Sequence, residues 1–379
     1  MAPIGMRISL LGPTYPFRGG IAHYTTALCN ALRERGHEVD FISFKRQYPG
    51  FLFPGKDDRD PSESPLTAED VAYILDPVNP VTWLKAALRV KRHRAEMLLM
   101  PWWVAYWAAP FAAVGSLVRK TAETKVVFQC HNVIEHESTA LRKFLTRRAL
   151  KRGHAFIVHS SADLRNLKKI MPLADIKQCR LPALDFAGKM GNESVLSDRH
   201  TPSILFFGFV RPYKGLDVLL GAMPQIIRRT GASLVVAGEF WSQGKQQYVD
   251  RMNKLGIADH VTLHDRYIKN EEVVGFFREA DVVVVPYRSA TGTGIVPIAF
   301  SFGKPVVATA VGCLPDVVRD GETGFLVPPG DSASLADAVE KCLEGECLRT
   351  FRANITGRQG DLSWDKYIAI IESFIANEA

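Results

Sequence analysis

The chain has 379 residues, enough for two domains with sizeable cores, and its 47% hydrophobic and 23% charged residues are ordinary for a soluble globular enzyme. The net charge of +7 is uneven, because residues 1–200 carry 29 Lys and Arg against 19 Asp and Glu, whereas residues 201–379 carry 18 against 21. The six cysteines form no CxxC pair and no zinc-like spacing, which argues against a zinc-binding protein and favours a reducing compartment.

The first part of the chain alternates strands with helices. A strand is predicted over residues 7–11, a helix over 21–35, a strand over 38–44 and a Pro-, Gly- and Asp-rich surface loop over 48–70. The first strand follows Met1 almost directly, without the pattern of a signal peptide. We therefore expect a cytoplasmic location.

Residues 97–118 contain no charge, and this length is close to that of a membrane span. Pro101 and Pro110 interrupt the segment, however, and prolines fit poorly inside a helix. We therefore favour a buried strand over 97–103 and a helix over 109–119. Further strands are predicted near 125–130 and 155–159, and this alternation indicates a parallel sheet with helices on both faces.

Apolar periodicity is lost between about Lys189 and Pro202, which we interpret as a linker. The pattern then restarts, with strands predicted over 204–207, 234–237, 261–264, 281–286 and 304–309 and helices over 216–228, 246–255, 271–278 and 295–302. A last amphipathic helix is predicted over 363–376, with Ser363 as its N-cap. The sequence thus predicts an α/β protein of two doubly wound domains, residues 1–188 and 202–360, with a ligand cleft at the carboxyl ends of both sheets.

Two cations, Arg211 and Lys214, lie in the turn between the strand at 204–207 and the following helix. Cations beside a helix N-terminus form an anion site. A nucleotide-diphosphate leaving group requires such a site, because its charge grows as its bond to the sugar breaks. The alternative is a capped helix with two solvated cations.

A loop of small residues, Ser289–Gly294, connects the strand at 281–286 to the next helix. Strand, small-residue loop and helix are typical of phosphate sites, and here the backbone N–H groups of five residues are candidates: Thr291, Gly292, Thr293, Gly294 and Ile295. Gly19 and Gly20, after the first strand, likewise allow a ligand to approach the backbone closely. Either segment is also compatible with an ordinary tight turn. The absence of G-x-G-x-x-G disfavours a nicotinamide dehydrogenase.

His131 follows the strand at 125–130, at a position where polar side chains face a cleft. It is a candidate to hydrogen-bond a sugar hydroxyl or a developing charge. Glu135 and Glu137 are candidates to position or deprotonate an acceptor hydroxyl. A metal site of His131, Glu135 and His136 lacks a further ligand, and a structural histidine remains the alternative. The Asp58-Arg59-Asp60 triplet is interpreted as a solvated loop.

Residues 138–152 are predicted to form a basic amphipathic helix. Its apolar face carries Leu141, Phe144, Leu145, Ala149 and Leu150, and its basic face carries Arg142, Lys143, Arg147, Arg148, Lys151 and Arg152. With Arg89, Lys91, Arg92 and Arg94, this face is suited to an anionic membrane surface, although a solvated basic face is the alternative. Nucleic acid is disfavoured as a partner, because the basic runs lack interleaved aromatic residues.

With these pieces in order, the chain resembles the family 4 glycosyltransferases, which are retaining enzymes of the GT-B fold. The resemblance rests on the Gly19-Gly20 turn, the strand end at His131, the FFGFVRPYKGLD segment and the run from GKPVVAT to GETGFLVPPGD. It implies two Rossmann-like domains, a nucleotide-sugar donor held mainly by the second, and no obligatory metal or other cofactor. It also implies that a C-terminal helix, residues 361–379, crosses back to the first domain.

The resemblance assigns roles to individual residues. Lys214 matches the lysine that binds the diphosphate, and Arg211 substitutes for an arginine that the family carries where this chain has Phe209. His131 matches a histidine near the donor sugar. Tyr267 and Ile268, after Arg266, lie where the chain of the family passes the nucleobase.

The departure from the family is its paired-glutamate motif, whose positions are Ala290 and Ile298 in this chain. The first glutamate normally meets the donor sugar and the second the ribose. Here the backbone from Thr291 to Gly294 and the Thr291 and Thr293 hydroxyls are expected to take over these contacts.

We therefore expect a retaining hexosyltransferase that uses a nucleotide-diphosphate sugar as donor. The expected acceptor is a hydroxyl of a lipid-linked or polysaccharide molecule in cell-surface glycan biosynthesis. The expected location is cytoplasmic, with peripheral attachment to the inner face of the membrane left open. A nucleotide-sugar-binding protein without transferase activity is the alternative, because both glutamates are absent.

Overall fold

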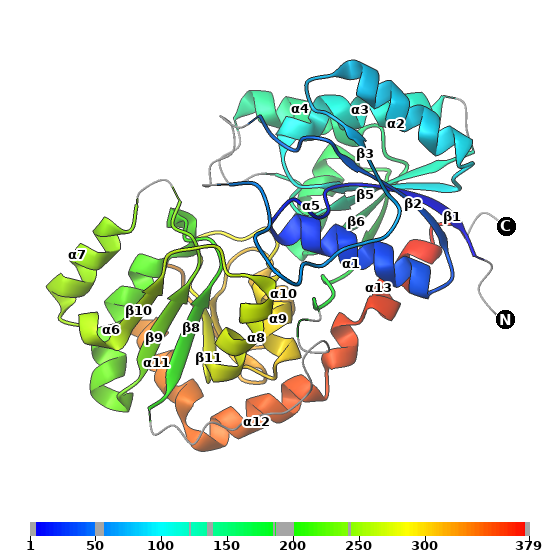
Figure 1. The fold of residues 1–379 in the computed structure, drawn as a ribbon. Helices are drawn as coiled ribbons and strands as arrows, with labels where there is room; N and C mark the ends of the chain where they lie inside the picture. The colour runs from blue at the N-terminus through cyan, green and yellow to red at the C-terminus, as the bar shows by residue number, and fades with distance from the viewer. Residues whose placement is uncertain are drawn as a thin grey trace. The chain divides into compact units, whose positions relative to one another are not determined.

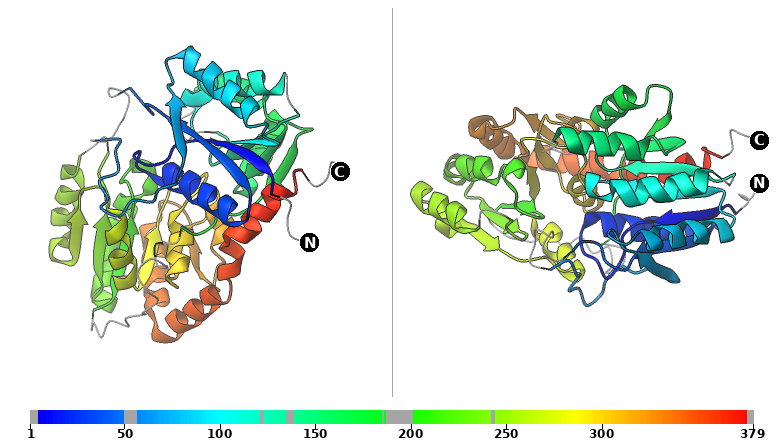
Figure 2. Two further views of the ribbon diagram at one scale, coloured as in Figure 1. Left: turned by 45° about the vertical axis from the view of Figure 1, so that its right-hand side comes forward. Right: turned by 90° about the horizontal axis from the view of Figure 1, so that it is seen from above.

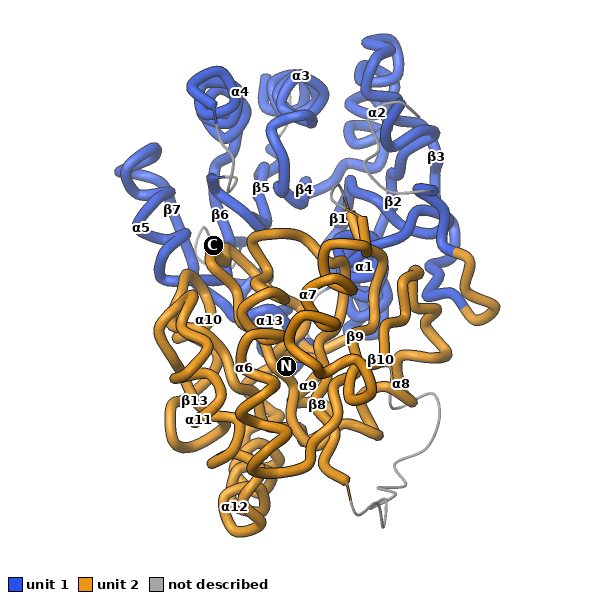
Figure 3. Tube along the Cα trace, turned by 90° about the vertical axis from the view of Figure 1, so that its left-hand side faces the viewer, with its two compact units in different colours: residues 1–60, 65–182, 363–379 blue, residues 61–64, 183–362 orange. Residues whose placement is uncertain are grey.

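The computed structural model describes residues 5–49, 57–120, 123–134, 139–184, 186, 201–241 and 244–375. The chain divides into two compact units, coloured separately in Figure 3. Unit 1 contains residues 1–60, 65–182 and 363–379, and unit 2 contains residues 61–64 and 183–362. Most of the linker expected between Lys189 and Pro202 lies outside the described residues.

The described part of unit 1 contains a seven-stranded parallel sheet of order β3-β2-β1-β4-β5-β6-β7 (Figure 1). Its strands are β1 (Arg7–Leu11), β2 (Glu38–Phe44), β3 (Val71–Leu75), β4 (Met97–Trp102), β5 (Lys125–Cys130), β6 (Ala155–Val158) and β7 (Asp175–Gln178). Its helices are α1 (Gly20–Glu34), α2 (Pro80–Arg92), α3 (Ala108–Arg119), α4 (Ala140–Leu150), α5 (Ser161–Ile170) and α13 (Trp364–Glu372). The strand order reverses between β1 and β4, which is the position where open α/β sheets bind ligands.

Alternating side chains of the strands divide the core of unit 1 into two layers. Leu98 and Met100 pack with α2, α3, α4 and α5 on one face, whereas Met97 and Leu99 pack with α1 and α13 on the other. Strands covered on both faces must be apolar throughout, and β4 is buried at all six positions. This burial explains why residues 97–118 read as a continuous apolar run.

Those residues form β4, a short 3₁₀ turn and α3, so the predicted division into strand and helix is confirmed. None of the helices in the described residues combines the length and the apolarity that a membrane span requires.

The helix α13 completes the core of unit 1, although it follows all of unit 2 in the chain. The helix lies beside α1 (Figures 1 and 2). Tyr367, Ile368, Ile371 and Phe374 are buried in the core that β1 and α1 share. Glu372 accepts hydrogen bonds from Arg35 at 3.1 Å and lies 3.1 Å from a ring nitrogen of His37. The predicted N-cap is confirmed, because the Ser363 side chain accepts a hydrogen bond from the Lys366 N–H at 3.3 Å.

Unit 2 contains a six-stranded parallel sheet of order β10-β9-β8-β11-β12-β13. The strands are β8 (Ser203–Phe207), β9 (Ser233–Ala237), β10 (Val261–His264), β11 (Val282–Val285), β12 (Val306–Thr309) and β13 (Gly324–Val327). The helices are α6 (Leu216–Thr230), α7 (Gln246–Leu255), α8 (Asn270–Glu279), α9 (Ile295–Ser301), α10 (Leu314–Val317), α11 (Ser332–Leu343) and α12 (Gly345–Thr356). The α6, α7 and α11 helices pack on one face, and α8 and α9 lie on the other (Figure 1).

Both units are therefore doubly wound α/β domains, as the sequence predicts. In unit 2 the strand order reverses between β8 and β11. The turns that follow these two strands contain Lys214 and Ile295, so the sheet topology places both predicted phosphate-binding segments at the switch point.

Candidate functional site

The turn after β8 is shaped by two glycines with positive φ, Gly208 and Gly215. Gly215 has φ of +69°, and a Cβ at this position would lie 2.0 Å from the carbonyl oxygen of Pro286, at the end of β11. Gly208 has φ of +94°, and a Cβ there would lie 3.1 Å from Lys214 Nζ and 3.6 Å from Ile295 Cδ1. The missing side chain of Gly208 thus leaves the space in which the Lys214 ammonium and the start of α9 come together.

Lys214 is buried, and the part of the chain that the structure describes provides no counter-charge for it. Its side chain is 9% exposed, and its Nζ lies 5.5 Å from the centre of the Tyr287 ring, in cation–π range. Among the described residues, no carboxylate forms an ion pair with it, whereas the nearby Arg288 is paired with Asp217 at 2.8 Å. Burial, with a smaller contribution from Arg211, lowers the pKa of Lys214 to about 7. Such a cation is costly to bury unless an anion compensates it.

Arg211 lies between two aromatic rings. Its guanidinium carbon is 5.2 Å from the centres of both the Tyr213 and the Trp241 rings. No carboxylate pairs with Arg211 among the described residues either. The turn therefore offers two cations near each other, and the aromatic rings hold Arg211 without neutralising it.

The small-residue loop after β11 is held by its own side chains. The Thr293 hydroxyl is buried, accepts a hydrogen bond from the Ile295 N–H at 3.2 Å and is hydrogen-bonded to the Tyr287 hydroxyl. In this structure, therefore, the Ile295 N–H and the Thr293 hydroxyl are engaged with the protein. The helix that follows, α9, has seven residues and ends one residue earlier than predicted. Thr291, Gly292 and Gly294 complete the loop.

The positions of the two missing glutamates are apolar and buried. Ala290 is 7% exposed, and Ile298 is 6% exposed. Gly312 has φ of +55°, and a Cβ at this position would lie 1.5 Å from the Ala290 carbonyl oxygen. The backbone of this loop thus packs directly on the segment after β12.

The predicted nucleobase segment lies at the carboxyl end of β10. The Tyr267 ring is 6.3 Å from the Phe209 ring, which is in turn 4.6 Å from the Trp241 ring. Ile268 is 7% exposed. Nη1 and Nη2 of Arg266 both donate to the Glu272 carboxylate. Phe209, at the position of the family arginine, therefore belongs to an aromatic group that adjoins the Arg211 site.

In unit 1, Gly19 and Gly20 form the start of α1. Gly19 has φ of +107°, and a Cβ on either glycine would meet no atom within 4 Å. The turn is therefore open, as close approach of a ligand requires.

His131, by contrast, is 5% exposed, and its Nε2 has no hydrogen-bond partner among the described residues. Burial, and to a smaller extent His159, holds the pKa of His131 well below its usual value. The ring is therefore neutral near pH 7. Glu135, His136 and Glu137 lie outside the described residues.

The Asp58-Arg59-Asp60 triplet is only partly the solvated loop that the sequence suggested, because the Arg59 side chain is 55% exposed but that of Asp60 is not. The Asp60 carboxylate is 2% exposed and lies 3.3 Å from His23 Nε2, and the Asp58 carbonyl accepts a hydrogen bond from the Arg18 N–H. The triplet thus packs on the turn that precedes α1. Within the described residues, no group of three or more His, Cys, Asp and Glu side chains is arranged to hold a metal ion.

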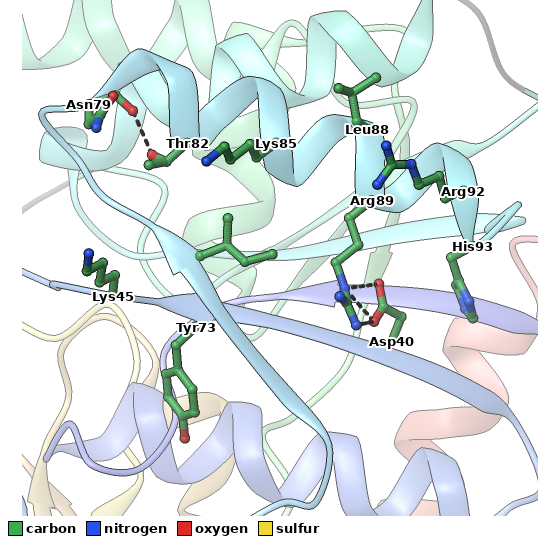
Figure 4. A pocket seen from close by; sticks show the side chains of 11 residues that line it. Asp40, Lys45, Tyr73, Asn79, Thr82, Lys85, Leu88, Arg89, Arg92 and His93 are labelled. Atoms are coloured by element: carbon green, nitrogen blue, oxygen red, sulfur yellow. Dashed lines mark hydrogen bonds and ion pairs between the residues drawn. The ribbon is translucent and has the colours of Figure 1, made fainter.

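The basic surface of unit 1 includes two hollows. One, of about 910 Å³, lies between α2 and the strands β2 and β3, and its lining includes Lys45, Lys85 and Arg92 (Figure 4). Arg89, which the sequence assigns to the basic surface, donates to Asp40 at 2.7 Å. The other hollow, of about 450 Å³, is formed by Phe144, Arg147, Arg148, Lys151 and Arg152 on and after α4.

The apolar side of α4 differs from the sequence expectation. Ala149 and Leu150 are buried, but Leu141 is 65% and Phe144 is 54% exposed. The Arg148 guanidinium lies 5.7 Å from the centre of the Phe144 ring. Exposed apolar side chains therefore lie among the cations of this helix, which is typical of a surface that contacts lipid.

Solved structures share the fold of the whole chain. It superimposes on sucrose-phosphate synthase from Thermosynechococcus elongatus with a TM-score of 0.70 at 20% identity, over 98% of both chains. It superimposes on Anabaena HepE in complex with UDP with a TM-score of 0.73 at 18% identity, over 98% of this chain and all of the other. These likenesses establish the GT-B fold.

Two family models match the chain, "Glycosyltransferase Family 4" over residues 18–178 and "Glycosyl transferases group 1" over residues 201–345. The chain belongs to the GT-B glycosyltransferases. A GDP-mannose-dependent alpha-(1-6)-phosphatidylinositol monomannoside mannosyltransferase of Mycolicibacterium smegmatis is 28% identical over 368 residues, 90% of each chain. A phosphatidyl-myo-inositol mannosyltransferase of Mycobacterium leprae is 35% identical over 153 residues, 39% of this chain and 38% of that protein.

The sequence of this glycosyltransferase did not reveal the aromatic walls of its cation site. Tyr287 and Trp241 follow β11 and β9, so both stand at carboxyl ends of strands, and Tyr213 lies between the two cations. The distance of Trp241 and Tyr287 from Lys214 in sequence concealed these two residues, although position after a buried strand is a signal that could have been used.

Proposed function

We propose that this glycosyltransferase is a retaining family 4 enzyme. It transfers a hexose from a nucleotide-diphosphate sugar to a hydroxyl of a lipid-linked or polysaccharide acceptor in cell-surface glycan biosynthesis. The observation that carries the proposal is the buried Lys214 ammonium, which has no carboxylate partner among the described residues and lies near a second such cation. A diphosphate is the ligand whose charge compensates both.

In the proposed reaction, the bond between the anomeric carbon and the diphosphate oxygen breaks, and the diphosphate keeps the electron pair. The acceptor hydroxyl oxygen bonds to the anomeric carbon and gives up its proton to an oxygen of the departing diphosphate. Lys214 and Arg211 stabilise the charge that develops on the departing diphosphate, which is the most effective place for fixed positive charge. Because these side chains supply that charge, we propose that no metal is required. His131 orients the reacting sugar as a neutral hydrogen-bonding group.

The names of the relatives support a donor and an acceptor of this kind. One relative is named for GDP-mannose and a phosphatidylinositol mannoside, and one structural neighbour was solved with UDP. We therefore propose a GDP- or UDP-hexose as donor and a glycolipid as the first acceptor class to assay. Tyr267 and the backbone at Ile268 are proposed to contact the base, and Gly19, Gly20 and the Thr291–Gly294 loop the donor.

Replacement of Lys214 tests the proposal directly. Lys214→Ala is expected to lower turnover on the order of a hundred-fold, because one preorganised charge is removed from the transition state. Arg288→Ala, which removes a neighbouring cation already paired with Asp217, is the control and should change turnover little. Near-full activity of Lys214→Ala would refute the assignment. The anomeric configuration of the product, read by NMR, tests retention.

A nucleotide-sugar-binding protein without transferase activity is the second candidate, and the buried Ala290 and Ile298 favour it. Both positions lack the carboxylate that the family motif would supply. Calorimetric binding of a nucleotide sugar, without transfer or hydrolysis across a broad panel of acceptors, would establish this alternative.

We also propose that unit 1 attaches peripherally to an anionic membrane surface. The support is the combination of exposed Leu141 and Phe144 with the cations of α4, and of Lys45, Lys85 and Arg92 around the hollow beside α2. No nucleic-acid partner is proposed.

A further inference from the structure

A group of aromatic side chains, four of them buried and Trp364 partly buried, lies together in unit 1. We call it the His131 cluster, and it consists of Tyr24, His131, His159, Trp364 and Tyr367. The His131 ring centre lies 5.1 Å from that of His159 and 6.1 Å from that of Tyr24, and His159 lies 5.9 Å from Tyr367. Because His131 follows β5 and His159 follows β6, the two histidines stand side by side at the carboxyl ends of paired strands.

Polar atoms in this cluster lack the hydrogen bonds that buried groups normally make. His131 Nε2, His159 Nε2 and the Tyr24 hydroxyl are buried, and none has a partner among the described residues. The three side chains are 5%, 3% and 3% exposed. Buried polar atoms in native proteins are nearly always satisfied, by protein or by an ordered water. Neighbouring imidazoles satisfy each other when one nitrogen carries a proton and the other a lone pair.

The surroundings of His159 determine which of its nitrogens carries the proton. Its Nδ1 lies 2.9 Å from the Cys179 carbonyl oxygen, which can only accept, so Nδ1 is the protonated nitrogen. Burial lowers the pKa of His159 to about 4, so the ring is neutral near pH 7. Its Nε2 therefore carries a lone pair and can act only as an acceptor.

We propose that His159 is a positioning residue for His131: a small rotation of the two neighbouring rings, whose Nε2 atoms are not hydrogen-bonded in the structure, lets the His159 Nε2 lone pair accept a hydrogen bond from His131 Nε2–H. This contact fixes His131 as the Nε2–H tautomer and leaves Nδ1 as a hydrogen-bond acceptor for a sugar hydroxyl. The inference about sugar binding rests on the proposed function, whereas the tautomer of His131 does not.

Tyr24 provides the competing arrangement. Burial raises the pKa of its hydroxyl, which therefore stays protonated and can donate. Donation to His131 Nε2 would force the opposite tautomer, with the proton on Nδ1. The tautomer of His131 distinguishes the two arrangements, because only a hydrogen bond to His159 requires a proton on His131 Nε2.

The experiment is a two-bond ¹H–¹⁵N NMR correlation on the full chain without substrate near pH 7, with His131 assigned by its loss in His131→Asn. The expected spectrum shows His131 protonated at Nε2. His159→Phe keeps an aromatic ring but removes the acceptor, so His131 should become a mixture of tautomers. His159→Gln restores an acceptor oxygen and should restore the Nε2–H form. Tyr367→Phe, on the other side of His159, is the matched control and should leave the tautomer unchanged.

The kinetic experiment measures kcat and KM for the same His159 variants. His159→Phe is expected to lower kcat about ten-fold, the equivalent of one hydrogen bond, with KM for the donor little changed. His159→Gln should recover most of this loss, which a purely structural role would not predict.

An Nδ1–H tautomer of His131 in the wild-type protein would overturn the proposal, as would His159→Phe with wild-type tautomer and kcat. The wild-type spectrum requires no variant to fold. If transfer is absent but the tautomers behave as expected, the proposed function fails and the pairing of the two histidines stands.

Discussion

The pKa of Lys214 predicts how the affinity for a nucleoside diphosphate depends on pH. Burial and Arg211 lower this pKa from the ordinary value of 10.5 to about 7. A diphosphate binds the charged ammonium and stabilises it. Raising the pH above 7 therefore removes from the free protein the cation that the ligand needs, and affinity must fall as pH rises.

The size of the effect follows from the protonated fraction of Lys214. With a pKa of about 7, roughly half of the free protein carries the ammonium at pH 7 and about 1% at pH 9. If the bound diphosphate returns the pKa to its ordinary value, the dissociation constant rises about fifty-fold between these pH values, or ~2.3 kcal/mol. Binding at pH 9 should take up about one proton for each ligand.

Titration calorimetry with UDP and GDP from pH 7 to pH 9 measures both quantities, in buffers of different ionisation enthalpy. Lys214→Arg is the matched control, because a guanidinium stays protonated throughout this range and its dissociation constant should be nearly flat. Ionisation of the ligand affects both proteins equally. A change of less than about three-fold in the wild-type protein, or an equal slope in Lys214→Arg, would refute the reasoning.

Gly215→Ala should lower the thermal midpoint far more than Gly231→Ala. Both glycines have φ near +70°, but only at Gly215 would the Cβ meet backbone, 2.0 Å from the Pro286 oxygen. Equal decreases of the thermal midpoint in the two variants would contradict this close approach. Replacing Arg147, Arg148 and Lys151 with Glu should weaken binding to anionic vesicles on the order of a hundred-fold, at about 1 kcal/mol for each cation. The same charge change at Lys245, Arg251 and Lys254 in unit 2 is its control, and vesicle binding that is indifferent to salt would exclude the basic surface.

The sequence predicted the central strands of both sheets and the edge strand β10, but it missed the edge strands β3, β7 and β13. β4 and β11 are buried at every position, so their apolar runs stand out. β3 and β7 are the edge strands of unit 1, and β7, with the sequence DIKQ, has no buried residue. An edge strand joins the sheet through its backbone and needs little apolar surface, so composition does not reveal it.

In the candidate site, the sequence likewise revealed residues that are close together in the chain, but not contacts that depend on the order of the strands. Arg211 and Lys214 could be recognised because they share one turn with the start of a helix. The proximity of Lys214 to Tyr287 and Ile295 depends on β11 lying next to β8, which is a property of strand order. His159 was missed for a similar reason, since its relation to His131 requires the pairing of β5 with β6.

The position of α13 in the chain has a consequence for biosynthesis. The core of unit 1 includes Tyr367, Ile371 and Phe374, yet all of unit 2 is encoded before them. During translation, unit 1 leaves the ribosome first but lacks α13. Its β1 and α1 surface therefore stays uncovered until the entire second unit has been made. Unit 2 can complete its own sheet first, so the order of folding is expected to be the reverse of the order of synthesis.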